Sequence, residues 1–459
     1  MKYLKHVAIA RNVTLLAGLT GVLLYATVHW GGVVRQDRDV YLLALGGLAL
    51  FAGLLRYGVS GAPRLSPIFR WLLPLIPAWA ILQIVPLPLS LVRALSPARG
   101  QTLAVLAGLG DTPKYASLSV FPSGTMQQLL LISGYIAVFL LVRELMWFFS
   151  ARPWLLAVPL VLAATWEAIV GVIQYSTATD RVALGNYVNR DHFAGLLELA
   201  LPFAVVYPLT FFPLNLRRNG IQVSDALKVF ASWAVAVVLL AGITFSLSRM
   251  GFLSALFSLL VMGVVASLGN PVARRFATPA ARWVAVGVVA AVVVATLVLL
   301  PPDRLVERFA KLSDNGGIDK GRPELWRETI NLVQAYPIFG CGLGGYRSAF
   351  PKYKVTAPLV SDDYAHNDYL QFLAEMGIGA AILFVLAGAT VRDALRGAFT
   401  ASDPQRWSLA LGCVGSLSAI LLHSAADFNL AIPANAMVVC WVAALATSVS
   451  YSRVLQKTQ

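Results

Sequence analysis

The sequence predicts an all-α protein that crosses a membrane many times. Of its 459 residues, 58% are hydrophobic and only 13% are charged, with a mean hydropathy of +0.72, whereas a soluble domain carries about 25% charged residues. Apolar runs of about 20 residues, which as helices cross roughly 30 Å of hydrocarbon, recur along the whole chain. A transmembrane barrel would instead need short segments of alternating polarity. We therefore expect about 12 transmembrane helices.

The apolar runs define the predicted spans in order. The first run is too long for a signal peptide and lacks a small-residue cleavage site, so we expect it to remain as an anchor. No internal repeat and no low-complexity tract are visible. The spans are predicted at residues 12–30, 40–58, 69–86, 126–148, 153–175, 192–212, 227–246, 250–268, 282–300, 367–390, 407–424 and 433–451.

The formal charge of +14 would suit a nucleic-acid binder, but the basic residues sort by loop. In a twelve-span arrangement they gather on the side that holds both termini, as the positive-inside rule predicts for cytoplasmic loops. The basic excess therefore indicates topology, with cytoplasmic termini, and no nucleic-acid partner. These residues are Lys2, Lys5, Arg11, Arg56, Arg64, Arg70, Arg143, Arg152, Arg217, Arg218, Lys228, Arg274, Arg275, Arg282, Arg392, Arg396, Arg406, Arg453 and Lys457.

The same arrangement places two long loops outside, from about Pro86 to Thr125 and from Pro301 to Ala365. Residues 322–337 in the second loop have the pattern of an amphipathic helix. This helix either lies on the membrane surface or over a cavity, or packs on the top of the bundle. The expected regions are 1–125 (spans one to three and the first loop), 126–300 (spans four to nine), 301–366 (the second loop) and 367–459 (the last three spans).

The stretch "GCGLGG" (340–345) matches the dinucleotide-binding pattern G-x-G-x-x-G. That motif needs a preceding strand, but here a predicted helix and Pro337 precede it. We expect a glycine turn that brings the backbone close to another element. The cysteines Cys341, Cys413 and Cys440 indicate neither a disulfide nor a metal cluster.

Charged residues occur in four segments near the predicted outer ends of spans. Loop ends often hold solvated charges, but these four share one predicted side. Arg249 lies in a very short turn between two apolar spans, where a half-buried guanidinium needs an anionic partner. The segments hold Arg190, Asp191 and His192; Arg249; Asp362, Asp363, His366 and Asp368; and His423 and Asp427.

This combination favours one chemistry. Arginine binds phosphate oxygens bidentately and keeps its proton, and a helix start, as at Arg190, adds backbone N–H groups and a positive dipole end. A histidine beside such a cluster can act as a general base toward a hydroxyl. The residues therefore predict transfer of a group from a lipid phosphate or diphosphate to an alcohol.

Six stretches, in this order along roughly residues 117–450, resemble the bacterial O-antigen ligase and O-antigen polymerase family. The resemblance implies a GT-C-like bundle and a metal-independent glycosyltransferase without cofactors. The first hundred residues match only in hydropathy. The stretches are "SLSVFPSGTMQQLLLISGYIAVFLL", "GNYVNRDHFAGLLELALP", "SLSRMGFLSALFSLLV", "GRPELWRETINLVQAYPIFGCGLGGY", "HNDYLQFLAEMGIGA" and "HSAADFNLAIPANA".

The resemblance also implies the substrates. The donor is an oligosaccharide on undecaprenyl diphosphate, presented at the periplasmic face of the inner membrane, and the sugar passes with inversion to an acceptor hydroxyl. In a polymerase the acceptor is a growing surface glycan (O-antigen, capsule or exopolysaccharide) on a second lipid carrier, and a chain-length regulator is a further partner. In a ligase the acceptor is the lipid A-core of lipopolysaccharide. Both remain open, with a slight preference for the polymerase.

Residue roles follow from the motifs. Arg190 and Arg249 match the arginines that hold the donor diphosphate, and His366 matches the catalytic histidine. Arg322, which opens "GRPELW", lies in the family's external-loop motif. The alternative for His366 is a structural cap of its helix. His192, in "NRDHF", departs from family patterns with a second asparagine after the basic residue and receives no role.

Further residues are expected to support His366. A base that works near neutral pH needs a pKa close to that pH, and the ordinary histidine value of about 6.5 meets this requirement. Asp363 is the candidate to orient the ring, although Asp362 and Asp368 are equally near in sequence. The other supporting candidates are Asn367, Asp427 and His423, and His423 is the next candidate for the base.

Two other classes stay open. A flippase for lipid-linked glycans would also show many spans and arginines, but it should carry charges at mid-membrane depth and internal repeats. The main acids inside the predicted spans are Glu167, Glu198 and Glu375. A metal-dependent transferase would use Asp362, Asp363 and Asp368 around Mg²⁺ or Mn²⁺.

Overall fold

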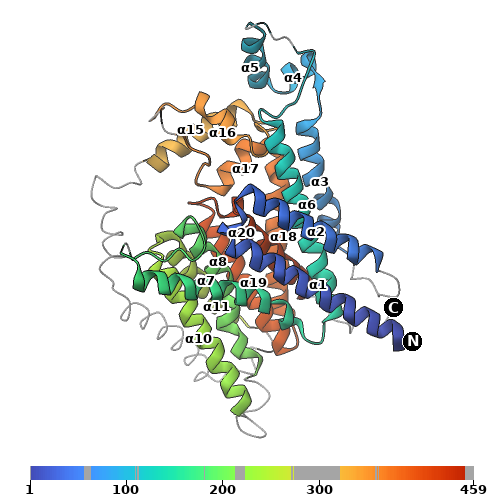
Figure 1. Cartoon of the computed structure of the whole chain (residues 1–459), viewed down its shortest axis with the longest axis vertical. Helices are drawn as coiled ribbons and strands as arrows, with labels where there is room; N and C mark the ends of the chain where they lie inside the picture. The colour runs from blue at the N-terminus through green and yellow to red at the C-terminus, as the bar shows by residue number, and fades with distance from the viewer. Residues whose placement is uncertain are drawn as a thin grey trace.

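The computed structural model describes residues 2–55, 64–108, 110, 113–179, 181–211, 223–269, 272, 321–356, 359 and 361–449. Over these residues the chain is almost entirely helical (Figure 1). The strands β1 (Leu87–Pro88) and β2 (Tyr115–Ala116) form one short antiparallel pair. The predicted all-α class is confirmed.

Eleven of the twelve predicted spans coincide with helices, and the remaining one, 282–300, lies outside the described residues. The helices are α1 (Lys2–Val28), α2 (Arg35–Leu54), α3 (Pro67–Ile84), α6 (Pro122–Phe148), α7 (Val158–Thr177), α8 (Arg190–Val206), α10 (Val223–Phe245), α11 (Arg249–Ser267), α17 (Asp368–Met376) with α18 (Ala380–Thr400), α19 (Pro404–His423) and α20 (Pro433–Val449). Short 3₁₀ turns join several of them: η1 (Trp30–Gly32), η2 (Pro153–Leu156), η3 (Tyr207–Thr210), η6 (Gly377–Gly379) and η7 (Asn429–Ala431).

In the described part of the chain, nine helices are long and apolar enough to cross a membrane. The helix α2 is not among the nine because charged residues fill its first turns, and α20 is shorter, with 17 residues. The prediction of a polytopic membrane protein is confirmed.

The centre of the bundle is the pair α8 and α19, which are buried along almost their whole length. They pack on each other, and α7, α10, α11, α18 and α20 surround them. Gly412 on α19 permits the close approach, since a Cβ there would lie 2.6 Å from the Phe203 ring of α8. Small residues at such crossings let membrane helices pack tightly.

A second layer lies over one end of the bundle, and we call it the cap (Figure 1). Trp326 of α15 donates its indole N–H to Ala365 O at 3.0 Å, and α15 packs on α17. The predicted amphipathic helix at 322–337 therefore exists and packs on protein. The cap contains α4 (Leu89–Leu95), α5 (Pro97–Gly108), α15 (Gly321–Ala335), α16 (Tyr346–Ala349) and η5 (Phe350–Lys352).

The glycine turn at 340–345 locks the cap onto the bundle. Gly340 has φ +71°, and a Cβ there would lie 2.2 Å from the backbone carbon of Glu375. The predicted span 367–390 is not one continuous helix, because it breaks at Gly377. This glycine has φ +56° and lies against the backbone of residues 337 and 338. The expected close backbone approach is confirmed, and its partner is this break.

Candidate active site

Several helices begin where the cap meets the bundle. Arg190 is the first residue of α8, Arg249 the first of α11, and Arg322 the second of α15. α17 begins nearby at Asp368, beside the link between α19 and α20, residues 424–432. Helix N-termini carry unpaired N–H groups and a partial positive charge, so this junction suits an anion.

The link between α19 and α20 is held from two sides. Arg322 Nη1 donates to Ala426 O at 2.8 Å, and Asn367 Nδ2 donates to Ala425 O at 2.8 Å. These bonds tie the link to α15 and to the start of α17. They thereby fix the position of the next residue, Asp427.

His366 lies in the turn immediately before α17, where Asn367 caps the helix by accepting from Leu370 N at 3.1 Å. His366 has φ +47°, a left-handed conformation that costs a non-glycine residue about 1–3 kcal/mol. Its side chain is 34% exposed, and its Nδ1 lies 3.6 Å from Asp427 Oδ1. The opposite ring nitrogen, Nε2, is therefore left for a substrate.

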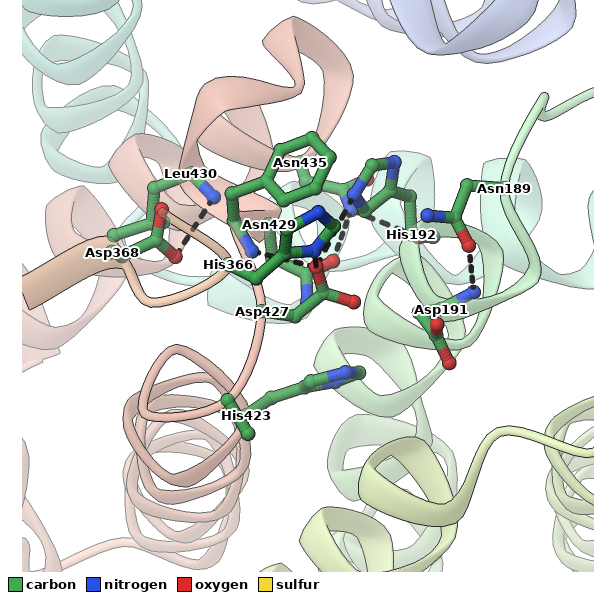
Figure 2. Close-up of polar contacts among 12 residues, drawn as sticks. Asn189, Asp191, His192, His366, Asp368, His423, Asp427, Asn429, Leu430 and Asn435 are labelled. Carbon is green, nitrogen blue, oxygen red and sulfur yellow. Dashed lines mark hydrogen bonds and ion pairs between the residues drawn. The ribbon is translucent and has the colours of Figure 1, made fainter. Parts of the chain in front are cut away.

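Asp427 is almost fully buried, with 2% of its side chain exposed. Its Oδ1 accepts the Phe428 amide at 2.8 Å and lies 3.8 Å from His192 Nε2. Burial would raise the pKa of Asp427, but the imidazoles of His192 and His366 outweigh burial and hold this pKa well below its ordinary value. Asp427 is therefore a carboxylate at neutral pH, and Figure 2 shows the rings of His366 and His192 beside it.

Phe428 fixes the planes of both imidazoles. Tyr364 stacks on its ring with centroids 4.2 Å apart. The rings of His192 and His366 meet it nearly perpendicularly, at 4.5 and 4.7 Å. This packing leaves the two imidazoles little freedom to turn away from Asp427.

The carboxylate beside His366 is not the expected Asp363. Asp363 is half-exposed and pairs with Arg347, Nε to Oδ1 3.0 Å. Although it lies three residues from His366 in sequence, its side chain is engaged by this cap arginine. Asp427, which the motifs also named as a supporting candidate, faces the ring because the α19–α20 link folds back over the start of α17.

The three aspartates of the metal-dependent alternative do not converge. Asp362 pairs with Lys354 and Asp363 with a cap arginine. Asp368 is buried and accepts from Ser424 Oγ at 2.7 Å. Over the described ranges, no group of three or more acidic, histidine or cysteine side chains could hold a metal ion.

The second candidate base, His423, is fully buried. Its Nδ1 lies 3.1 Å from both carboxylate oxygens of Glu198, between α8 and α19. It therefore cannot meet a substrate in this arrangement. The other two acids in spans are also engaged: Glu167 accepts from the Asn186 amide at 2.7 Å, and Glu375 accepts from Gln371 Nε2 at 2.8 Å.

The three arginines at the junction are all half-buried. Arg249 interacts electrostatically with Arg190, Arg322 and Asp191. The predicted short turn is confirmed, since α10 ends at residue 245 and Ser248 caps α11. Three cations around one acid leave a local excess of positive charge.

The sequence assigned no role to His192. In the structure, its side chain faces the same carboxylate, Asp427, as His366 does. It occupies the first turn of α8, and its side chain is 6% exposed. Its contact with Asp427 joins α8 to the α19–α20 link, and a contact between segments so far apart in sequence leaves no local pattern. The one sign in the sequence that His192 belongs to the site was its position two residues after Arg190.

Residues 234–385 match the family described as O-antigen ligase. The matched segment contains Arg249, Arg322 and His366, whereas Arg190, His192 and Asp427 lie outside it. No curated protein matches the chain. This segment, with many apolar helices around it, makes the chain similar to the O-antigen ligase family of membrane proteins.

Proposed function

We propose that the protein transfers an oligosaccharide from undecaprenyl diphosphate to an acceptor sugar hydroxyl. The observation that carries this proposal is the pairing of His366 with buried Asp427 at the junction where Arg190, Arg249 and Arg322 lie in the first turns of three helices. The family match supports glycan transfer of this type.

The arginine side of the junction would hold the donor diphosphate. Arg190 and Arg249 supply fixed positive charge and bidentate donors, and the starts of α8 and α11 add backbone N–H groups. Arg322, whose Nη1 is tied to Ala426 O, adds charge close to His366. This charge stabilises the diphosphate as it departs.

The histidine side would activate the acceptor. His366 Nε2 takes the proton of the acceptor hydroxyl while that oxygen bonds to the anomeric carbon of the donor sugar. The bond from the same carbon to the diphosphate oxygen breaks on the opposite face, which inverts the configuration. Asp427, on Nδ1, stabilises the imidazolium that forms, as in other histidine–carboxylate pairs.

We further propose that the junction faces the periplasm and that both termini are cytoplasmic. Support comes from the end opposite the cap, where Arg143 of α6 and Arg406 of α19 line a pocket with the end of α20. Basic residues of this kind mark the cytoplasmic ends of spans. The protein would then work in the bacterial inner membrane.

The acceptor decides between polymerase and ligase, and we favour the polymerase. The test is to incubate the purified protein with lipid-linked oligosaccharide alone and to resolve the products by size. A ladder of lengthened lipid-linked glycans is expected. If product forms only after lipid A-core is added, the protein is a ligase. His366→Ala protein is the control for background transfer.

A further inference from the structure

Two imidazoles face a single oxygen of Asp427. His366 Nδ1 lies 3.6 Å and His192 Nε2 lies 3.8 Å from Oδ1. Both nitrogens are buried and form no hydrogen bond within 3.5 Å to any described residue. A shift of a few tenths of an ångström would bring either into bonding range, and catalytic hydrogen bonds are often long until substrate binds.

Three donors approach this carboxylate. The Phe428 amide donates to Oδ1 at 2.8 Å, and the two imidazole nitrogens lie just beyond hydrogen-bond distance of the same oxygen. The two oxygens of a carboxylate together offer about four acceptor sites, so Asp427 can serve both rings at once. Since His192 comes from α8 and His366 from the turn before α17, Asp427 bridges two elements that would flank the substrate (Figure 2).

Charged or titratable groups from three helices act on Asp427. Glu198 belongs to α8, Asp368 to α17 and His423 to α19, and each interacts electrostatically with Asp427. From α15, Arg322 reaches the residue before Asp427. His192 differs from these groups because it contacts Asp427 through a ring nitrogen that has no other partner among the described residues.

We propose that His192 is a positioning residue, whose Nε2–H holds Asp427 Oδ1 in place to orient His366. The role rests on the proposed function, in which His366 is the base. Without the contact, Asp427 would keep its charge but lose the N–H group of His192, the buried donor that faces the carboxylate together with His366. The carboxylate could then turn, and the imidazolium formed during transfer would lose part of its stabilisation.

Packing alone is the competing explanation, because the His192 ring also meets the Phe428 edge at 4.5 Å. Two substitutions separate these roles. His192→Phe keeps an aromatic ring of similar shape and loses the donor. His192→Gln loses the ring and keeps an N–H group at a similar reach.

The experiment compares single-turnover rates and donor affinity for both variants in one detergent. We expect His192→Phe to slow transfer roughly tenfold, the effect of about 1.4 kcal/mol, with donor affinity unchanged, and His192→Gln to stay within about threefold of wild type. His29→Phe, at a histidine that stacks on Tyr25, is the matched control and should be unaffected.

A double-mutant cycle completes the test. In an Asp427→Ala background, which has no side-chain acceptor for His192, His192→Phe should have little further effect, because the contact it removes is already lost. A fully active His192→Phe, or equal losses in both backgrounds, would overturn the positioning role. An inactive His192→Gln would also overturn it, since the ring itself would then be needed. Loss of the proposed function would show separately, as an active His366→Ala protein.

Discussion

His366 combines a left-handed backbone, a buried anion on one ring nitrogen and an exposed opposite edge. We predict that His366→Ala slows transfer by roughly 10²–10⁴-fold, the range for a lost general base. Donor affinity should change little, because the arginines remain. Single-turnover rates and donor titrations on the same preparation measure both quantities. Wild-type turnover would assign the base elsewhere.

Asp427 should govern the acid limb of the pH–rate profile through its neighbour. Its own pKa is held well below the ordinary value by the two imidazoles, so Asp427 stays charged across the working pH range. Asp427→Asn removes a negative charge beside His366, which disfavours the imidazolium. The acid limb should therefore move to lower pH as the maximal rate falls. A limb that moves to higher pH would contradict the assigned pair.

The arginines should affect binding instead. Arg249→Ala is expected to weaken donor binding roughly tenfold to a hundredfold, since a charge-assisted hydrogen bond contributes about 1.5–3 kcal/mol. Arg249→Lys should recover only part of this loss, because it keeps charge without the fork. Arg347→Ala is the matched control, as that arginine is 68% exposed and pairs with Asp363. Equal effects at both positions would mean that Arg249 has no specific role.

The residue-scale predictions from sequence rest on local patterns, and such patterns do not report contacts that depend on folding. Arg190, Arg249 and His366 stand out because each is a charged or titratable residue beside an apolar run. Asp363 was chosen by its closeness in sequence to His366, yet the ring faces Asp427, which follows a different helix. Contacts between distant segments leave no periodic signal in one sequence.

Among the elements, the turn at 340–345 and the break at Gly377 support each other. The sequence indicated a glycine turn, because a G-rich stretch follows a helix and a proline. It did not indicate the break in the tenth span, because residues 376–384 continue the apolar pattern. The break exists because carbonyls of residues 337 and 338 occupy the space that a side chain at 377 would need.

Gly340→Ala should therefore destabilise the joint between cap and bundle. A Cβ would clash with the Glu375 backbone and sit on a left-handed φ, and such strain costs about 1–3 kcal/mol or more. Gly388→Ala, in α18 with nothing within 4 Å of the added Cβ, is the control. Thermal unfolding in detergent measures the difference. Equal stability of the two variants would show that the cap tolerates displacement.

At the scale of the whole molecule, charge and architecture both support the proposed orientation. The four charged segments that are predicted to lie outside occur near the junction of cap and bundle, whereas Arg143 and Arg406 lie at the opposite end. Apolar periodicity was sufficient to predict the bundle, since span length follows from bilayer thickness. The order in which the helices pack was not predictable, because apolar faces of similar composition do not specify their neighbours.

This orientation can be tested with two single cysteines. Val355 lies beside the cap and is 80% exposed, and Val223 begins α10 at the opposite end and is 84% exposed. In intact cells stripped of their outer membrane, Val355→Cys should react with a membrane-impermeant maleimide, and Val223→Cys only after permeabilisation. The unmodified protein gives the background, which should be low because Cys341 and Cys413 are buried and Cys440 is partly buried. The reverse labelling pattern would place the junction in the cytoplasm, where a periplasmic donor could not reach His366, and the proposed reaction would lose its substrate.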